Sequence, residues 1–163
     1  MDDLLQWLYD LPVSQTVREL LWVFPTLEWI HIYSMVFLIT VFAALDLRLM
    51  GFAMEPHPRQ PLSQLAKKIL RLAWISLGVN AVTGTLLFMS SAPDYYVNSA
   101  FRIKILLIAV GVAYHWAVIG VVLPMVDRED NAAAMPIGNK LVGGFSLAIW
   151  VGVIAASRWI AFV

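Results

Sequence analysis

The chain has 163 residues, of which 61% are hydrophobic and 13% charged, and its formal net charge is zero. A soluble domain carries about 25% charged residues, so this composition argues against a water-facing fold. The sequence contains no cysteine, which excludes disulfides, thiolate metal sites, iron–sulfur clusters and thioether-linked haem. Zero net charge without a basic tract argues against a nucleic-acid partner.

Four uncharged runs predict membrane-spanning helices. They are 17, 21, 22 and 17 residues long and cover Trp29–Leu45, Leu72–Ala92, Ile105–Val126 and Leu141–Ser157. A helix needs roughly 17 to 25 mostly apolar residues to cross a bilayer. The sequence therefore predicts one small integral membrane domain whose main partner is the lipid bilayer.

The first residues predict a short helix that lies on the membrane surface. Within residues 2–13, one helical face carries the apolar side chains, as in interfacial helices: Leu4, Trp7, Leu8 and Leu11. The acidic start of this segment is unlike a secretory signal, so no cleaved targeting peptide is predicted.

The first spanning helix is predicted over about residues 16–50. Ser14 and Thr16 are candidate N-caps, a bend is expected near Pro25, and Gly51 is expected to end the helix. The other three helices are predicted over about 65–91, 101–126 and 140–163. Short connections between successive helices favour an all-α, antiparallel four-helix bundle in the membrane.

Basic residues near the predicted helix ends indicate the orientation of the chain. One side holds seven and the other four: Arg48, Arg59, Lys67, Lys68, Arg71, Arg128 and Lys140 against Arg18, Arg102, Lys104 and Arg158. The positive-inside rule places the richer side in the cytoplasm. In a bacterial inner membrane, both termini would then be periplasmic.

Two patterns indicate contacts between helices. Small residues recur every four positions in the last helix, and a polar stripe follows one face of the second: Gly144, Ala148, Gly152 and Ala156, then Ser76, Asn80 and Thr83. Small residues allow backbones to approach closely in lipid, and polar side chains there need partners. The small-residue pattern fits packing within the bundle or between protomers of a homo-oligomer.

His31 and His115 are the most informative residues, because ionisable side chains within membrane spans are rare. Counted from Asp46 and Asp127, they lie about 22 and about 18 Å deep at 1.5 Å per residue, so similar depths are expected. Two imidazoles at one depth can be the axial ligands of a single b-type haem.

Neighbouring residues fit such a haem site. Gly111, one turn from His115, would leave room for a flat macrocycle, and Met35 would contact it. Ser34 could accept the second N–H of His31 and fix its tautomer. The alternative is that each histidine is satisfied within the protein, or takes part in proton movement, without a metal.

Basic side chains on the predicted outer side could pair with haem propionates. Arg102 and Lys104 are favoured because they share a helix with His115, and Arg158 is a further candidate. Each of them could instead anchor a helix end among lipid headgroups.

Glu28 and His31 have the E-x-x-H spacing of di-iron bundles, but the sequence holds no second copy, so a di-iron site is not expected. Glu28 could instead accept protons, bond a ligand, or pair with Arg18 or Lys104 as an interfacial carboxylate.

Two further features lie toward the predicted cytoplasmic end of the first helix. Met50, Met54 and His57 are soft ligands that could hold Cu(I), although the segment is rich in proline. Asp46 and Arg48 are too closely spaced to face each other on a helix and are expected to cap or anchor its end.

These residues resemble a group of small, uncharacterised bacterial four-helix membrane proteins. The resemblance spans about residues 23–118 and rests on a P-x-x-E-x-x-H segment, a D-L-R-L segment and an A-F-R-x-K segment. The matching residues are Pro25, Glu28, His31, Asp46, Arg48, Leu49, Gly84, Phe101, Arg102 and Lys104. His115 stands at the position where the group has a histidine in its third helix. In architecture alone, the chain is similar to b-type cytochromes and to CopD-type copper-resistance membrane proteins.

Two hypotheses follow. In the first, the protein is a b-type cytochrome domain that holds haem between His31 and His115 and exchanges electrons with quinol or a partner subunit. In the second, it is a non-redox accessory subunit or small transporter. Glu28, His31 and the polar stripe of the second helix would then line a path for protons or a metal ion, and the protein would work in an oligomer or a larger complex.

Overall fold

The computed structural model describes residues 2–52, 62–122 and 137–162, and every regular element in these ranges is a helix. Four helices are long and apolar enough to cross a membrane, over Val23–Leu49, Leu70–Ser90, Ser99–Gly120 and Ile137–Phe162. The predicted all-α, four-span architecture is confirmed.

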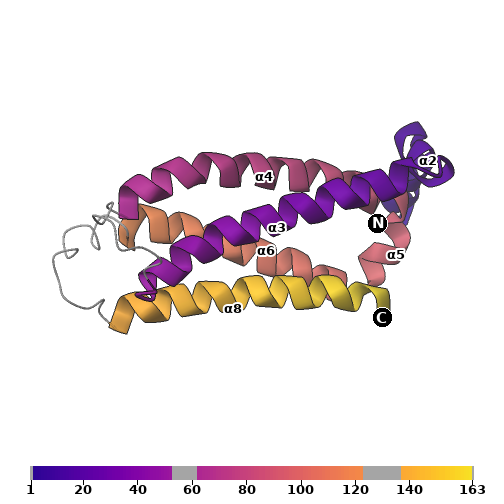
Figure 1. Ribbon diagram of the computed structural model, residues 1–163. Helices are drawn as coiled ribbons and strands as arrows, with labels where there is room; N and C mark the ends of the chain where they lie inside the picture. Colours follow the sequence, from indigo (N-terminus) through magenta and orange to yellow (C-terminus); the bar gives the residue numbers. More distant parts are fainter. Residues whose placement is uncertain (1, 53–61, 123–136, 163) are drawn as a thin grey trace.

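The spanning elements run alternately up and down the bundle. They are α3 (Val23–Leu49), α4 (Leu62–Ser90), α6 (Ser99–Ala117) and α8 (Ile137–Trp159). A π-helical turn, Val118–Val122, follows α6, and a 3-10 turn, Ile160–Phe162, follows α8. Figure 1 shows the two chain ends together at one end of the bundle, called here the terminal end. The far end is the end where α3 stops and α8 begins.

Three short helices cover the terminal end. α1 (Asp2–Asp10) and α2 (Pro12–Glu19) precede α3, and α5 (Ala92–Val97) connects α4 to α6. Arg18 joins α2 to α1 and to the end of α4, because its Nη1 donates to the carbonyl oxygens of Tyr9 at 2.7 Å and Ser90 at 3.3 Å, and its guanidinium lies over the Tyr9 ring. The predicted surface helix is present but ends at Asp10, where Pro12 starts a new helix.

The first spanning helix is shorter than predicted and does not bend at its proline. Residues 20–22 separate α2 from α3, and Pro25 lies in the first turn of α3. A proline there needs no hydrogen-bond partner, so it favours the start of a helix over a kink within it. Ser14 and Thr16 are not caps, because their hydroxyls donate to the carbonyl oxygens of Leu8 and Pro12.

The end of α3 follows the prediction. Gly51 has a positive φ of 88°, and the N–H of Phe52 donates to the Leu47 carbonyl at 2.9 Å, as in a Schellman motif. Glycine adopts this left-handed conformation without a steric penalty, which is why the helix ends here.

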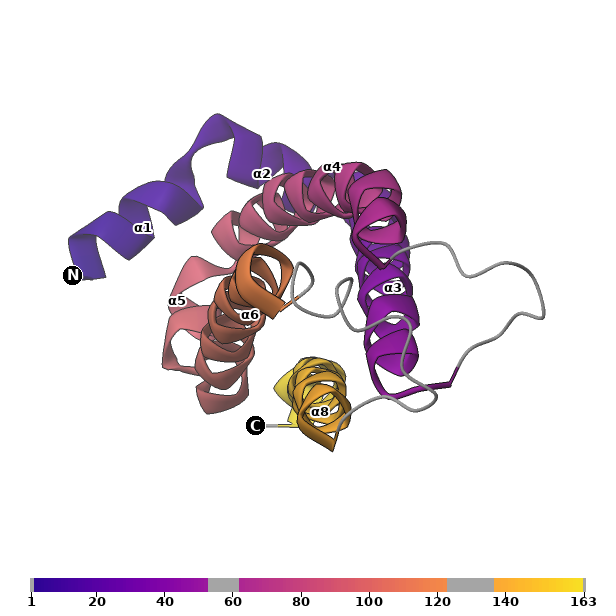
Figure 2. The same ribbon diagram turned by 90° about the vertical axis from the view of Figure 1, so that its left-hand side faces the viewer.

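The helices α4, α3, α8 and α6 form a row that curves around the interior (Figure 2). α8 packs against both α3 and α6, whereas direct packing between α3 and α6 is slight. α8 is therefore the element that holds α3 and α6 in register.

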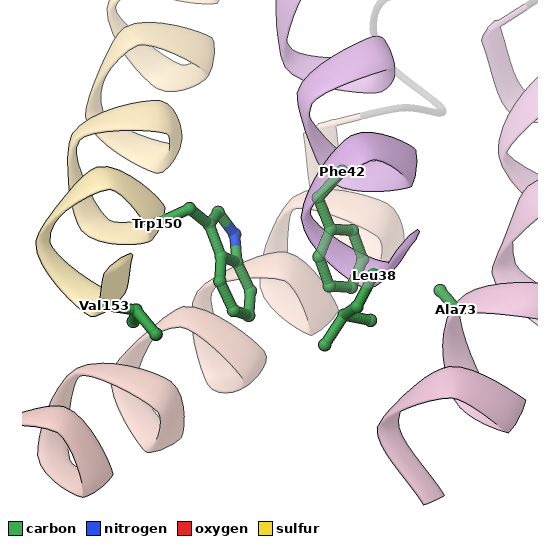
Figure 3. Packing of buried hydrophobic residues seen from close by; sticks show 5 residues of the cluster. All are labelled: Leu38, Phe42, Ala73, Trp150 and Val153. Atoms are coloured by element: carbon green, nitrogen blue, oxygen red, sulfur yellow. The ribbon is translucent and has the colours of Figure 1, made fainter. Parts of the chain in front are cut away.

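The buried core lies along the inner faces of α3 and α8. Figure 3 shows five of its side chains in the space between α3, α8 and α4: Leu38, Phe42, Ala73, Trp150 and Val153. A second cluster, toward the far end, contains Leu45, Leu49 and Val118. Most large apolar side chains on the outer faces are exposed, as a lipid-facing surface requires.

Candidate functional site

A buried carboxylate and a buried imidazole face each other between three spanning helices. Asp46 of α3 and His115 of α6 are 1% and 2% exposed, and the Asp46 Oδ1 lies 3.7 Å from the His115 Nε2. Ser146 of α8, also 1% exposed, lies beside them: its hydroxyl is 3.3 Å from the His115 Nε2 and within reach of the Asp46 carboxylate. We call Asp46, His115 and Ser146 the Asp46 centre.

Aromatic and backbone groups hold the other edge of the His115 ring. The Phe42 ring lies over it with centroids 3.8 Å apart. The His115 Nδ1 is 3.2 Å from the Gly111 carbonyl oxygen and 3.4 Å from the Trp150 Nε1. The carbonyl needs a hydrogen on Nδ1, whereas the indole N–H needs a lone pair there. Both tautomers of His115 thus have a partner in place.

The Asp46 carboxylate is incompletely satisfied. Its Oδ2 is buried and has no hydrogen-bond partner among the described residues. Native proteins rarely leave a buried polar atom unpaired, and such atoms often mark a functional group or a bound water. Asp46 also lies in the last turns of α3, where the helix dipole disfavours a negative charge. The position is costly for a purely structural aspartate.

A second polar cluster lies nearer the terminal end, between α3 and α4. The His31 Nδ1 is 3.1 Å from the Thr83 hydroxyl, and the Asn80 amide donates to the His31 carbonyl and the Ser34 hydroxyl at 3.0 and 3.1 Å. The Ser34 hydroxyl donates to the His31 carbonyl, and the ring nitrogen contacts Thr83, not Ser34 as was predicted. The polar stripe of the second helix does point inward, as expected.

The hydrogen bonds of Thr83 indicate the tautomer of His31. The Thr83 hydroxyl donates its only hydrogen to a backbone carbonyl of its own helix, at 2.8 Å from the Val79 oxygen. With that hydrogen on the Val79 carbonyl, the Thr83 oxygen accepts from the His31 Nδ1–H; in the other ring tautomer the hydroxyl donates to Nδ1 instead. The hydrogen bonds of the described residues leave the His31 Nε2 unpaired, with its lone pair available.

The two histidines do not lie at the same depth. His115 stacks on Phe42, which is 11 residues beyond His31 on α3, or about 16 Å along the helix axis. The depth prediction is wrong because it took Asp46 as the end of the span, whereas Asp46 is buried beside His115. Two axial nitrogens of one iron lie about 4 Å apart, so these rings as placed do not fit one haem.

The other predicted haem contacts lie in different surroundings. The space beside Gly111 is filled, because a Cβ there would lie 3.2–3.3 Å from Ile149 and Trp150, so it offers no room for a macrocycle. Met35 packs against the Leu38 cluster.

The predicted propionate partners are near the terminal end. Arg102 is exposed, and the exposed Arg158 lies over the Phe162 ring at 5.0 Å. Lys104 is partly buried on α6, close enough for its charge to act on the His31 ring. The propionate role of these cations stays a prediction.

The remaining candidates are dispersed. Glu28 is exposed near Tyr95 of α5; burial raises the pKa of the Tyr95 hydroxyl, and the charges of Glu28 and Asp94 act in the same direction. Of the predicted copper ligands, Met54 and His57 lie outside the described residues. In the part of the chain that the structure describes, no three histidine or carboxylate side chains come close enough to hold a metal ion.

The sequence analysis missed the roles of Asp46 and Ser146. The expectation that Asp46 caps the helix end is wrong, because the side chain is buried and turned toward α6 and α8. A signal was present in the sequence: Phe42 and Leu49, four positions before and three after, put apolar side chains on the same helix face as Asp46.

Comparison with known proteins places the chain in a family but assigns no activity. The sequence model described as "Family of unknown function (DUF6644)" matches residues 20–163. The chain therefore belongs to this family, in agreement with the resemblance to uncharacterised membrane proteins. No curated protein and no solved structure shows a significant match to the chain.

Proposed function

We propose that this member of the family is a proton-transfer protein of the membrane, in which the Asp46 centre binds and releases a proton. One observation carries the proposal: the Asp46 carboxylate, 1% exposed, lies 3.7 Å from the His115 ring and leaves one oxygen without a partner in the described structure. Intramembrane acids paired with histidine are the usual components of proton relays.

Two opposing effects act on the protonation of this pair. Burial favours the neutral state, in which Asp46 carries the proton, because ionic groups lose their hydration inside the bundle. Mutual attraction favours the ion pair, and the C-terminal end of α6 stabilises a positive charge on His115. Because the two groups face each other, the proton can pass between them without leaving the site.

Ser146 and the two partners of Nδ1 support this exchange. The Ser146 hydroxyl can donate to either Asp46 or His115, so it can follow the proton between them. Trp150 or Gly111 then satisfies the opposite ring nitrogen in each tautomer. No state of the ring is left with an unpaired buried N–H.

The second polar cluster lies toward the terminal end and is called here the His31 cluster. It contains His31, Ser34, Asn80 and Thr83. The buried apolar side chains of Leu38 and Phe42 (Figure 3) lie along α3 between His31 and Asp46, and they separate the two clusters. Full transfer across the membrane therefore requires water to enter this apolar layer or the layer to move. Without such a movement, the Asp46 centre exchanges its proton with the solution at the far end of the bundle, because α3 ends three residues after Asp46.

Proton flux in proteoliposomes tests the proposal. A potassium gradient with valinomycin drives protons, and a trapped pH-sensitive dye reports them. We expect wild-type flux to be lost in Asp46→Asn and His115→Gln. It should be retained in Asp94→Asn, which changes an exposed aspartate of α5. Flux in Asp46→Asn equal to that of the wild type would contradict the proposal.

The tautomer of His31 favours a second candidate, a haem or copper protein. A histidine ligand typically donates one ring N–H to the protein and binds metal through the other nitrogen. His31 fits this arrangement in the tautomer that donates Nδ1–H to Thr83, because its Nε2 has no hydrogen-bond partner in the described structure. In this alternative His31 is a ligand, His115 is not its axial partner, and quinol or a protein would exchange the electrons.

Optical spectroscopy separates the two candidates. A Soret band with sharp α and β bands after dithionite reduction, lost in His31→Ala and kept in His115→Ala, would establish a haem held by His31. Loss in both variants would favour the two-histidine haem that the sequence suggested. A colourless protein from haem-replete cells, free of copper by elemental analysis, would contradict this second candidate.

A further inference from the structure

A close backbone contact between α8 and α3 lies beside the Asp46 centre. A Cβ atom built on Gly143 of α8 would lie 2.5 Å from the Asp46 carbonyl oxygen and 3.2 Å from its carbonyl carbon. The backbones of α8 and α3 therefore touch at this point, with a Cα–H of Gly143 directed at the Asp46 oxygen. A glycine is required here because any side chain would overlap with backbone, which cannot rotate aside.

The same face of α8 carries the groups that meet His115. Gly143, Ser146 and Trp150 follow one another at spacings of three and four residues, so they lie along one side of the helix, and all three are buried. Fixing α8 at Gly143 therefore also fixes the Ser146 hydroxyl and the Trp150 indole. Both contact His115, at 3.3 and 3.4 Å.

α8 also determines how far Asp46 lies from His115. These two residues belong to α3 and α6, which pack against each other only slightly and both pack against α8. An alanine at 143 would have to move its Cβ from 2.5 Å to at least 3.4 Å, the lower limit of ordinary contact. The resulting displacement of about 0.9 Å is large compared with hydrogen-bond tolerances.

From this geometry we infer that Gly143 is the positioning residue of the Asp46 centre: its contact with the Asp46 backbone holds α8 where Ser146 can bridge Asp46 and His115. The inference rests on the proposed function for its consequence, proton transfer, but the contact itself can be tested separately. Gly143 neither donates nor accepts the transferred proton, and it acts only through the position of α8.

The neighbouring glycine provides a matched control. Gly144 has the same chemistry and nearly the same depth, but a Cβ there would meet only the end of the Met50 side chain, at 4.0 Å. Gly143→Ala and Gly144→Ala both replace a helical glycine by a better helix former. Only the first forces α8 away from α3.

The experiment compares both variants by infrared spectroscopy and proton flux. The carboxyl band of Asp46 is identified as the band that Asp46→Asn removes. We expect Gly143→Ala to shift this band and lower the flux at least tenfold, and Gly144→Ala to leave both unchanged. An unchanged band and flux in Gly143→Ala would overturn the inference, as would equal effects in the two variants.

A measurement on the wild type covers the case in which Gly143→Ala does not fold. Solid-state NMR of the reconstituted protein, with ¹³C-labelled glycine and aspartate, should show a strong cross-peak between the Gly143 Cα and the Asp46 carbonyl carbon. Its absence would overturn the inference. If instead the wild type shows no Asp46-dependent flux, the proposed function fails, while the band shift and the cross-peak still decide the role of Gly143.

Discussion

Replacement of Trp150 should reveal how much the contacts of α8 contribute to stability. The side chain is 1% exposed, stacks on Phe42 with centroids 5.2 Å apart, and donates its Nε1–H to the His115 Nδ1. Trp150→Phe keeps most of the packing and loses the hydrogen bond, which in a membrane is worth about 0.6 kcal/mol. Trp150→Ala also opens a void, for which large-to-small changes of aromatic residues cost about 3–5 kcal/mol.

Equilibrium unfolding in mixed micelles, followed by circular dichroism, measures both free energies. Trp159 on the same helix is the control, because it is 63% exposed and its replacement by alanine should change the free energy of unfolding by no more than about 0.5 kcal/mol. The reasoning would be refuted if Trp150→Ala were no more destabilising than Trp159→Ala. α8 would then not hold the bundle together through this side chain.

Three further changes test local features of the structure. A Cβ on Gly84 would lie 2.9 Å from the His31 ring, so Gly84→Ala should shift the ¹⁵N signals of that ring, whereas Gly78→Ala, with nothing within 4 Å, should not. Asn98 caps α6 by accepting from its first turn at 2.9 Å, and Asn98→Ala should lower the free energy of unfolding by about 0.5–2 kcal/mol in the same micelle assay. Arg18→Ala removes the bonds that join α2 to α1 and α4, so hydrogen exchange in α1 should accelerate while exchange in α8 stays unchanged.

Hydrophobicity and helix-end signals were sufficient to predict the four spans and the end of α3 at Gly51. Both depend on local sequence, because a bilayer demands long apolar helices and a left-handed helix end favours glycine. The start of α3 was misplaced because Pro25 was treated as a kink. The local sequence does not tell a proline in the first turn of a helix from a proline that bends a long helix. The break at residues 20–22, which the structure shows, distinguishes the two cases.

The site could be predicted only in part, for a reason that Asp46 illustrates. A charged residue near the end of an apolar run ordinarily marks the membrane boundary, and the depth estimate for His31 relied on that rule. Asp46 departs from it because His115 and Ser146, 69 and 100 positions later in the chain, supply its partners. No pattern within α3 alone records those partners, although the polar stripe of the second helix was correctly expected to point inward.

The arrangement of the two polar clusters restricts how a proton could move through this protein. The His31 cluster is confined to α3 and α4, whereas the Asp46 centre requires α3, α6 and α8 together. α3 is the only spanning helix that contributes to both, and Leu38 and Phe42 occupy its inner face between them. A rotation of α3 would move this apolar layer and both clusters at once, but it would also break the backbone contact between Asp46 and Gly143. Local entry of water past Phe42 leaves that contact intact, and it is therefore the less costly way to connect the two clusters.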